Sequence, residues 1–250
     1  MKDKYVQDTD YRPTQLLVLV IDVSGSMDGY KLEACQNLLN DIFKRIQMLE
    51  VEEYVPKIEL AIIQYDCEVK IVRNPQTIEE DEQSPILEAG GFSETIKAME
   101  TAIQLVEDRK VFYRSIDQSY YSPWIMIISD GEPCGEKASQ ADINAISQRV
   151  AEDTKKRRYL MIGVGIGESE NEAPVDMAFL THTTPITITF NELRRDFNEI
   201  LSWERAPSWM SIKEQELAEQ LIRDELSALE KSMKELDSEI PLDKWMEELI

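Results

Sequence analysis

The clearest indication of the fold comes from the sequence Leu16-Leu17-Val18-Leu19-Val20-Ile21-Asp22-Val23-Ser24-Gly25-Ser26. Its first six residues form an unbroken aliphatic run, which is typical of a strand that is buried on both faces of a parallel sheet. The run ends at Asp22, and Ser24 and Ser26 follow at alternate positions with Gly25 between them. The pattern therefore predicts a buried strand that delivers three oxygen-bearing side chains onto one loop.

On either side of this loop, apolar runs of strand length alternate with longer helical patterns. Further strands are predicted at 58–65, 68–72, 124–128, 159–166 and 186–189, with a hairpin turn at Asp66-Cys67. Helices are predicted at 32–49, 94–109, 137–156, 175–180 and 191–203, and residues 73–89 are expected to form a polar, acidic connection. This alternation indicates an α/β fold with a doubly wound, mostly parallel sheet and helices on both faces.

The character of the chain changes after Trp203. Residues 205–208 have the composition of a linker, and residues 211–236 form one charged helical pattern whose apolar positions are spaced four, three, four and three residues apart: Ile222, Leu226, Leu229, Met233 and Leu236. This spacing suits a short coiled coil or a helix packed against its own domain, and the sequence leaves both open. We therefore divide the chain into an N-terminal lead-in (1–13), an α/β domain (14–203) and a charged C-terminal helical extension (204–250).

The composition excludes several classes of function. With 27 Lys and Arg against 49 Asp and Glu, the formal net charge of −22 repels phosphate backbones and disfavours nucleic-acid binding. No segment approaches the ~18 consecutive apolar residues that a membrane-spanning helix needs. The three cysteines (Cys35, Cys67 and Cys134) show neither metal-ligand spacing nor a disulfide framework, so we expect a cytoplasmic protein. A single histidine, His182, argues against any mechanism that needs several.

Two acidic loops follow buried strands: Asp22–Ser26 and Ser129-Asp130-Gly131-Glu132. In an open parallel sheet, ligands collect at the carboxyl ends of strands near the point where the strand order reverses. Carboxylate and hydroxyl oxygens suit hard divalent cations such as Mg²⁺. From the residues alone, the first loop is also compatible with a helix N-cap and the second with a plain turn.

These two acidic loops resemble those of a known protein family. Leu19-Val20-Ile21-Asp22-Val23-Ser24-Gly25-Ser26-Met27 resembles the start of a von Willebrand factor A domain, and Ile127–Pro133 is similar to the second acidic loop of that family. The resemblance covers about residues 14–203 and includes Gly90-Gly91 and the strand Met161–Gly165. The order Gly90-Gly91, Tyr113-Arg114, Pro123-Trp124 and Asp130–Pro133 is most similar to the tellurium-resistance TerY-type branch.

The resemblance implies a metal-ion-dependent adhesion site with one Mg²⁺, or Mn²⁺ or Ca²⁺ in its place, held by Asp22, Ser24, Ser26 and Asp130. In this family a threonine normally follows the Gly-Gly pair, but Phe92 stands there in this chain. We expect Ser93 to supply the missing oxygen, and Thr95 is a poorer candidate. The alternative is that the site has lost this ligand and binds metal weakly or not at all.

The same resemblance implies a non-enzymatic module in which an acidic side chain of a protein partner completes the metal shell. Five residues are candidates for the rim that sets specificity, although each is also compatible with an ordinary loop role: Met27, Tyr30, Phe92, Glu132 and Cys134. The TerY-type likeness implies an intracellular bacterial system of tellurium resistance, stress response or phage defence.

Three other functions compete with this one. A phosphohydrolase of the haloacid-dehalogenase type needs a second Asp two residues after the first, where this chain has Ser24, and Lys137 is only a conceivable catalytic lysine. A serine hydrolase would need a Gly-x-Ser-x-Gly elbow, which the Ser24–Ser26 segment lacks. The remaining alternative is a metal-free structural protein that assembles through the helix at 211–236.

Overall fold

The computed structural model describes residues 12–49, 56–130, 138–167, 178, 180–182 and 186–189. The predicted helix at 191–203, the C-terminal extension 204–250 and most of the lead-in 1–13 lie outside these residues. Of the short helix predicted at 175–180, only residues 178 and 180 are described, and both are helical.

The described strands form one six-stranded sheet with the order β3-β2-β1-β4-β5-β6. The strands are β1 (Thr14–Asp22), β2 (Lys57–Tyr65), β3 (Val69–Gln76), β4 (Trp124–Ser129), β5 (Leu160–Gly167) and β6 (Ile186–Thr189). Every neighbouring pair is parallel except β2 and β3, which form an antiparallel hairpin at one edge. The predicted mostly parallel sheet is therefore confirmed, including each of its strands.

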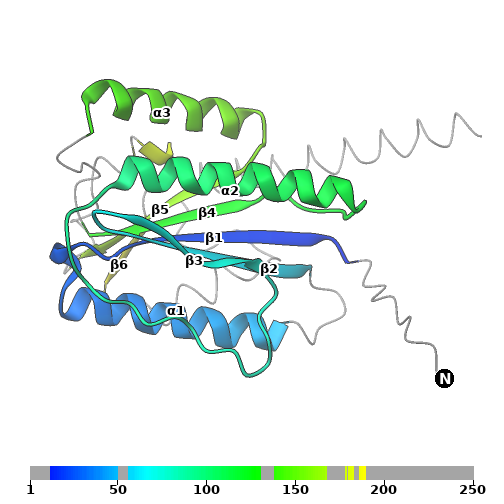
Figure 1. The fold of residues 1–250 in the computed structure, drawn as a ribbon, viewed down its shortest axis with the longest axis horizontal. Helices are drawn as coiled ribbons and strands as arrows, with labels where there is room; N and C mark the ends of the chain where they lie inside the picture. The colour runs from blue at the N-terminus through cyan, green and yellow to red at the C-terminus, as the bar shows by residue number, and fades with distance from the viewer. Residues whose placement is uncertain are drawn as a thin grey trace, which may run out of the picture. The chain divides into compact units, whose positions relative to one another are not determined.

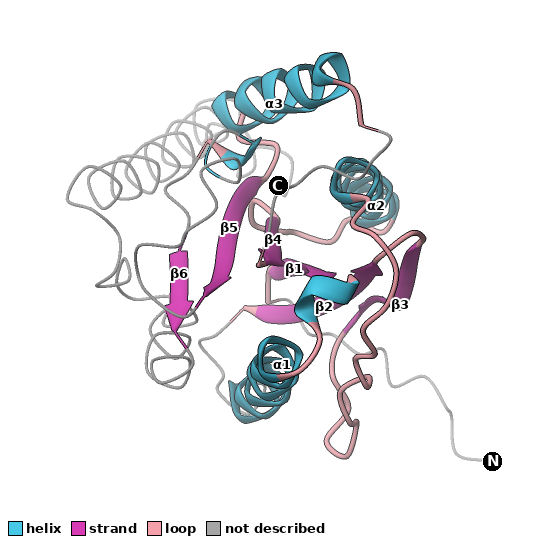
Figure 2. Ribbon diagram, turned by 90° about the vertical axis from the view of Figure 1, so that its left-hand side faces the viewer, coloured by secondary structure: helices cyan, strands magenta, loops and turns pink. Residues whose placement is uncertain are grey.

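Helices cover both faces of this sheet. Helix α1 (Tyr30–Leu49) lies on one face, and α2 (Thr95–Ser115) and α3 (Gln140–Lys155) lie on the other (Figures 1 and 2). Helix α2 continues six residues beyond the predicted end at Arg109. Helix α3 begins three residues later than predicted, because Ser139 and Asp142 form a reciprocal capping box at its start.

The connection predicted at 73–89 begins later than expected, because β3 runs on to Gln76. Arg73, which was predicted as the first residue of this connection, lies in β3. Its buried guanidinium donates hydrogen bonds to the carbonyl oxygens of Leu60, Gln76 and Thr77 and to the Glu82 carboxylate. This acceptor set satisfies a buried charge and ties the polar connection to β2. The polar residues of this segment suggest a solvent-exposed loop, but the buried side chain of Arg73 holds the segment against the sheet.

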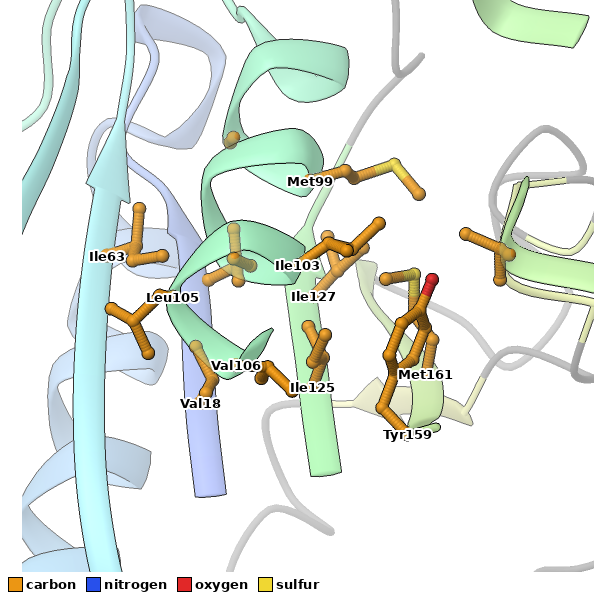
Figure 3. Packing of buried hydrophobic residues seen from close by; sticks show 14 of the residues in the cluster. Val18, Ile63, Met99, Ile103, Leu105, Val106, Ile125, Ile127, Tyr159 and Met161 are labelled. Carbon is orange, nitrogen blue, oxygen red and sulfur yellow. The ribbon is translucent and has the colours of Figure 1, made fainter. Parts of the chain in front are cut away.

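The core between the sheet and α2 is built from alternating strand residues. Val18 of β1, Ile63 of β2 and Ile125 and Ile127 of β4 pack against Met99, Ile103 and Val106 of α2 (Figure 3). Because successive side chains of a strand point to opposite faces, Leu17, Leu19 and Ile21 face the α1 side. All nine residues of β1 are buried, as expected for the central strand of a sheet covered on both faces.

A charged cluster interrupts this apolar face near the amino end of β2. Glu59, which is buried, accepts two hydrogen bonds from the Arg109 guanidinium (2.6 and 2.7 Å) and one from the Tyr113 hydroxyl (2.6 Å). Arg109 also stacks on the rings of Phe112 and Tyr113. The sequence analysis missed this cluster, although a glutamate inside an otherwise apolar strand was a usable signal, since buried carboxylates are nearly always paired.

The topology places the switch point of the sheet between β1 and β4. From β1 the chain passes through α1 to β2 on one side, whereas β4 joins β1 from the other side. The loops that follow Asp22 and Ser129 therefore leave from adjacent carboxyl ends at one edge of the sheet. None of the described helices combines the length and hydrophobicity needed to cross a membrane.

Candidate metal site at the carboxyl ends of β1 and β4

Asp22 ends β1 and is almost completely buried. One of its oxygens, Oδ1, accepts a hydrogen bond from the backbone N–H of Ser24 (2.8 Å). The other, Oδ2, accepts hydrogen bonds from the hydroxyls of Ser129 (2.8 Å) and Ser93 (3.1 Å). Three donors, one from the loop after β1, one from the loop before α2 and one from the end of β4, therefore hold this carboxylate in a single orientation.

Ser24, Ser26 and Asp130 continue this hydrogen-bonded set, and of these three residues only Ser26 is exposed. The hydroxyls of Ser24 and Ser26 lie 3.2 Å apart, and the Ser26 hydroxyl donates to Asp130 Oδ1 at 3.0 Å. Ser24 precedes a short 3₁₀ turn (η1, Gly25–Met27), but its side chain makes no capping hydrogen bond. The N-cap alternative for this loop is therefore not what the structure shows.

The Gly90-Gly91 loop approaches the first loop through its backbone. The N–H of Gly90 donates to the Val23 carbonyl (2.8 Å), and the N–H of Gly25 donates to the Gly91 carbonyl (3.0 Å). Phe92 has 63% of its surface exposed, and the next residue, Ser93, turns its hydroxyl to Asp22. The residue after the position of the expected threonine therefore has its hydroxyl beside Asp22.

Thr95 is fully buried at the start of α2, and its hydroxyl lies 2.9 Å from that of Ser93. Thr95 therefore contacts the Ser93 hydroxyl from the buried side and is not exposed at the surface of the loop. Of the two hydroxyls considered in the sequence analysis, Ser93 is therefore the one within hydrogen-bonding distance of Asp22.

Gly91 is required at its position for two reasons. Its φ of +68° lies in the left-handed region, and a Cβ added there would lie 2.7 Å from the sulfur of Cys67. We expect Gly91→Ala to destabilise the fold by more than the ~1–2 kcal/mol that the left-handed backbone alone costs. Urea denaturation measures the effect.

Gly29→Ala is the matched control, because Gly29 has φ +84° but no atom within 4 Å of an added Cβ. Gly91→Ala combined with Cys67→Ala should recover the part of the loss that comes from the contact. Equal losses for Gly29→Ala and Gly91→Ala would show that the contact with Cys67 has no energetic role.

Lys31, in the first turn of α1, brings a positive charge to this acidic site. Its ammonium makes a close ion pair with Asp130 Oδ2 and lies 3.4 Å from the carbonyl oxygen of Ser26. Neither Lys31 nor Ser129 was predicted as a member of the site. Lys31 is one of 27 basic residues, and nothing in its spacing from Ser26 distinguishes it.

The carboxylates of Asp22 and Asp130 influence the pKa values of two buried groups nearby, the Tyr65 phenol and the Cys35 thiol. Burial, and then the charge of Asp22, raise the pKa of the Tyr65 phenol well above its usual value. Burial also raises the pKa of the Cys35 thiol, with Asp22 and Asp130 adding to the effect. Both groups therefore stay neutral, and neither adds a negative charge to the site.

The donor set fits a hard divalent cation. Asp22 and Asp130 supply carboxylates, and Ser24, Ser26 and Ser93 supply hydroxyls, so every donor atom is oxygen. In the part of the chain that the structure describes, no three His, Cys, Asp or Glu side chains gather as they would around zinc. The set therefore resembles what Mg²⁺ takes, namely one or two carboxylates with hydroxyls and waters.

The predicted rim needs one correction. Met27 is fully buried, because the 3₁₀ turn directs it into the core, so it cannot touch a partner in this arrangement. Tyr30 and Phe92 are exposed beside the site, as a rim would require. Glu132 and Cys134 lie outside the described residues.

Comparisons with known proteins agree with this architecture. The family model of the von Willebrand factor type A domain matches residues 17–198. The vWF domain of the type V pili tip protein Mfa5 from Porphyromonas gingivalis superposes with a TM-score of 0.54 at 11% identity, over 76% of this chain and 94% of that one.

Two longer solved chains also match. A structure of three N-terminal domains of Mfa5 gives a TM-score of 0.52 at 12% identity, over 76% of this chain and 49% of that one. The ArnB paralog VWA2 from Sulfolobus acidocaldarius gives 0.43 at 18% identity, over 75% and 45%. This chain thus spans about half the length of these two chains. At 11% and 12% identity, the two Mfa5 structures show a likeness of fold alone. No curated protein sequence matches the chain.

Proposed function

Since this chain belongs to the von Willebrand factor type A domain family, we propose that it is a non-enzymatic module that binds a protein partner through one divalent cation. The residues that would hold Mg²⁺, or Mn²⁺ or Ca²⁺ in its place, are Asp22, Ser24, Ser26, Ser93 and Asp130. The observation that carries the proposal is their continuous hydrogen-bonded arrangement, which joins three loops at the switch point of the sheet.

The side chains of the proposed metal site would have different roles. Asp22 is held by three hydrogen bonds, so its carboxylate is already oriented when a cation arrives. Ser26 is exposed, and its hydroxyl links the first loop to Asp130. When bound, the cation supplies a positive centre with an exchangeable water, which a carboxylate of the partner would replace. An acidic protein could in this way bind an acidic side chain that its own charge would repel.

We further propose that the chain is cytoplasmic and works in a bacterial system of the TerY type, in tellurium resistance, stress response or phage defence. The support is the order of motifs that begins at Gly90-Gly91, together with the free thiols of Cys35 and Cys67. One part of that motif order has a structural role here, because Tyr113 donates to the buried Glu59.

A metal-free assembly protein is the second candidate, and the ion pair between Lys31 and Asp130 favours it. This pair already balances one of the two carboxylates without any metal. A phosphohydrolase has no comparable support. Ser24 stands where such an enzyme needs its second Asp, and the Ser24 hydroxyl forms a hydrogen bond with the Ser26 hydroxyl.

Titration with Mn²⁺, followed by calorimetry and electron paramagnetic resonance, separates these candidates. We expect the wild-type chain to bind one ion and Ser93→Ala to bind about tenfold more weakly, since one ligand oxygen is lost. Ser119→Ala, which changes an exposed serine outside the site, serves as the control and should bind as the wild type does. Absence of saturable Mn²⁺ binding by the wild type would reject the metal site and favour metal-free assembly.

The partner requires a separate measurement. A protein captured from the host extract in Mg²⁺ and released by EDTA would support the proposal if Asp22→Ala fails to capture it. A protein that stays bound in EDTA would contradict a cation-mediated contact.

A further inference from the structure

Lys31 pairs with the Asp130 oxygen that the hydrogen bond from Ser26 leaves unused. Asp130 Oδ1 accepts a hydrogen bond from the Ser26 hydroxyl, and Oδ2 pairs with the Lys31 ammonium. The same ammonium lies 3.4 Å from the Ser26 carbonyl oxygen, so it bridges the two loops. Both oxygens of Asp130 are therefore engaged by groups of this chain.

This ion pair is shielded from water. The side chain of Lys31 is 24% exposed and that of Asp130 only 2%, whereas the surface pair of Lys70 and Glu68 is 61% and 71% exposed. Charges interact more strongly at the lower effective dielectric of a shielded position, and salt screens them less. The contact with Lys31 is therefore a strong competitor for Asp130, unlike the surface pair.

The balance of charge shows what Lys31 changes. Asp22 and Asp130 together carry two negative charges, and Lys31 cancels one of them. A divalent cation in the cluster then leaves a single positive charge, which one carboxylate of a partner neutralises. Without Lys31, the two aspartates would neutralise the cation by themselves, and the partner's carboxylate would add an uncompensated negative charge.

We propose that Lys31 is a tethered cation that competes with the divalent cation for Asp130 and so weakens metal binding by the free domain. This inference rests on the proposed function, because it presupposes that the cluster binds metal. Its consequence is a loaded site with a net positive charge, which suits an acidic partner.

Lys31→Met tests the inference with Mn²⁺ as the probe and calorimetry as the readout. We expect the Kd for Mn²⁺ to fall about tenfold or more, because a positive charge a few ångströms from the site is removed. Lys31→Gln, which keeps a hydrogen-bond donor but loses the charge, should tighten binding as well. It also provides the measurement if Lys31→Met does not fold.

Two variants serve as controls. Lys31→Arg keeps the charge and should bind Mn²⁺ about as the wild type does. Lys44→Met removes the same charge from an exposed position on α1, about 20 Å further along the helix, and should have no effect. Tighter binding by Lys31→Arg, or an equal gain in Lys44→Met, would overturn the inference.

The outcomes distinguish this inference from the proposed function. If the wild type binds Mn²⁺, Asp22→Ala does not, and the neutral Lys31 variants bind no more tightly than the wild type, the inference alone fails. If neither the wild type nor the neutral Lys31 variants bind Mn²⁺, the metal site itself is rejected and the inference falls with it.

Discussion

Replacing Asp22 with alanine is expected to abolish divalent-cation binding while the chain still folds. Asp22 is the ligand candidate with the most hydrogen bonds to neighbouring loops, so its loss removes a charge and also the group that orients Ser93. In the metal-free chain two effects oppose each other. Three hydrogen bonds are lost, but a buried negative charge is removed as well.

The effect should appear as a difference in stability that depends on metal. At a Mg²⁺ concentration of 100 times its Kd, the wild type should gain about 2.7 kcal/mol of unfolding free energy, and Asp22→Ala should gain none. Thermal or urea unfolding with and without Mg²⁺ measures this difference. Asp28→Asn, which changes an exposed acid close to the same loop, should keep the full gain. An equal gain in Asp22→Ala would place the cation elsewhere.

The second large effect is expected at the other end of the sheet, where Glu59→Ala should destabilise the fold by about 3–5 kcal/mol. The substitution leaves the Arg109 guanidinium and the Tyr113 hydroxyl without their shared acceptor. Arg109 is partly exposed, so water can compensate some of this loss, and we place the result at the lower end of the range. Urea denaturation followed by circular dichroism measures it.

Glu68→Ala is the matched control for Glu59→Ala. Glu68 also pairs with a basic side chain, Lys70 at 3.1 Å, but both partners are exposed. Such surface pairs contribute about 1 kcal/mol or less, so this variant should stay close to the wild type. Similar losses for the two variants would show that burial does not determine the value of the Glu59 pair.

Strands β1, β2, β4 and β5 could be predicted from local pattern because they are mostly apolar runs that end at polar residues. The sheet buries β1, β4 and β5 on both faces, and such strands leave the clearest sequence signal. The edge strand β3 was predicted too short, since its exposed positions and Pro75 resemble a loop in the sequence. Helix α2 was also predicted too short, because the residues after the predicted end at Arg109 include polar side chains. One of them, Tyr113, is buried in the fold and donates to Glu59.

The candidate metal site was also predictable from the sequence only in part. Asp22, Ser24 and Ser26 lie within five consecutive residues, so the sequence alone presents them as a group. Asp130 could be added because carboxyl ends of neighbouring parallel strands share one edge. Ser93 came only from the resemblance, and the structure brings its hydroxyl to Asp22. Their role as metal ligands stays a prediction.

The α/β alternation and the two acidic loops at strand ends follow from the sequence alone, because hydrophobic periodicity and local spacing are properties of neighbouring residues. Which side chains meet across the loops depends on the tertiary fold. It buried Met27, which the sequence suggested as a rim residue, and it brought Lys31 of α1 to Asp130 after β4, 99 residues away. Pairs of that kind depend on strand order and helix packing, and no local pattern encodes them.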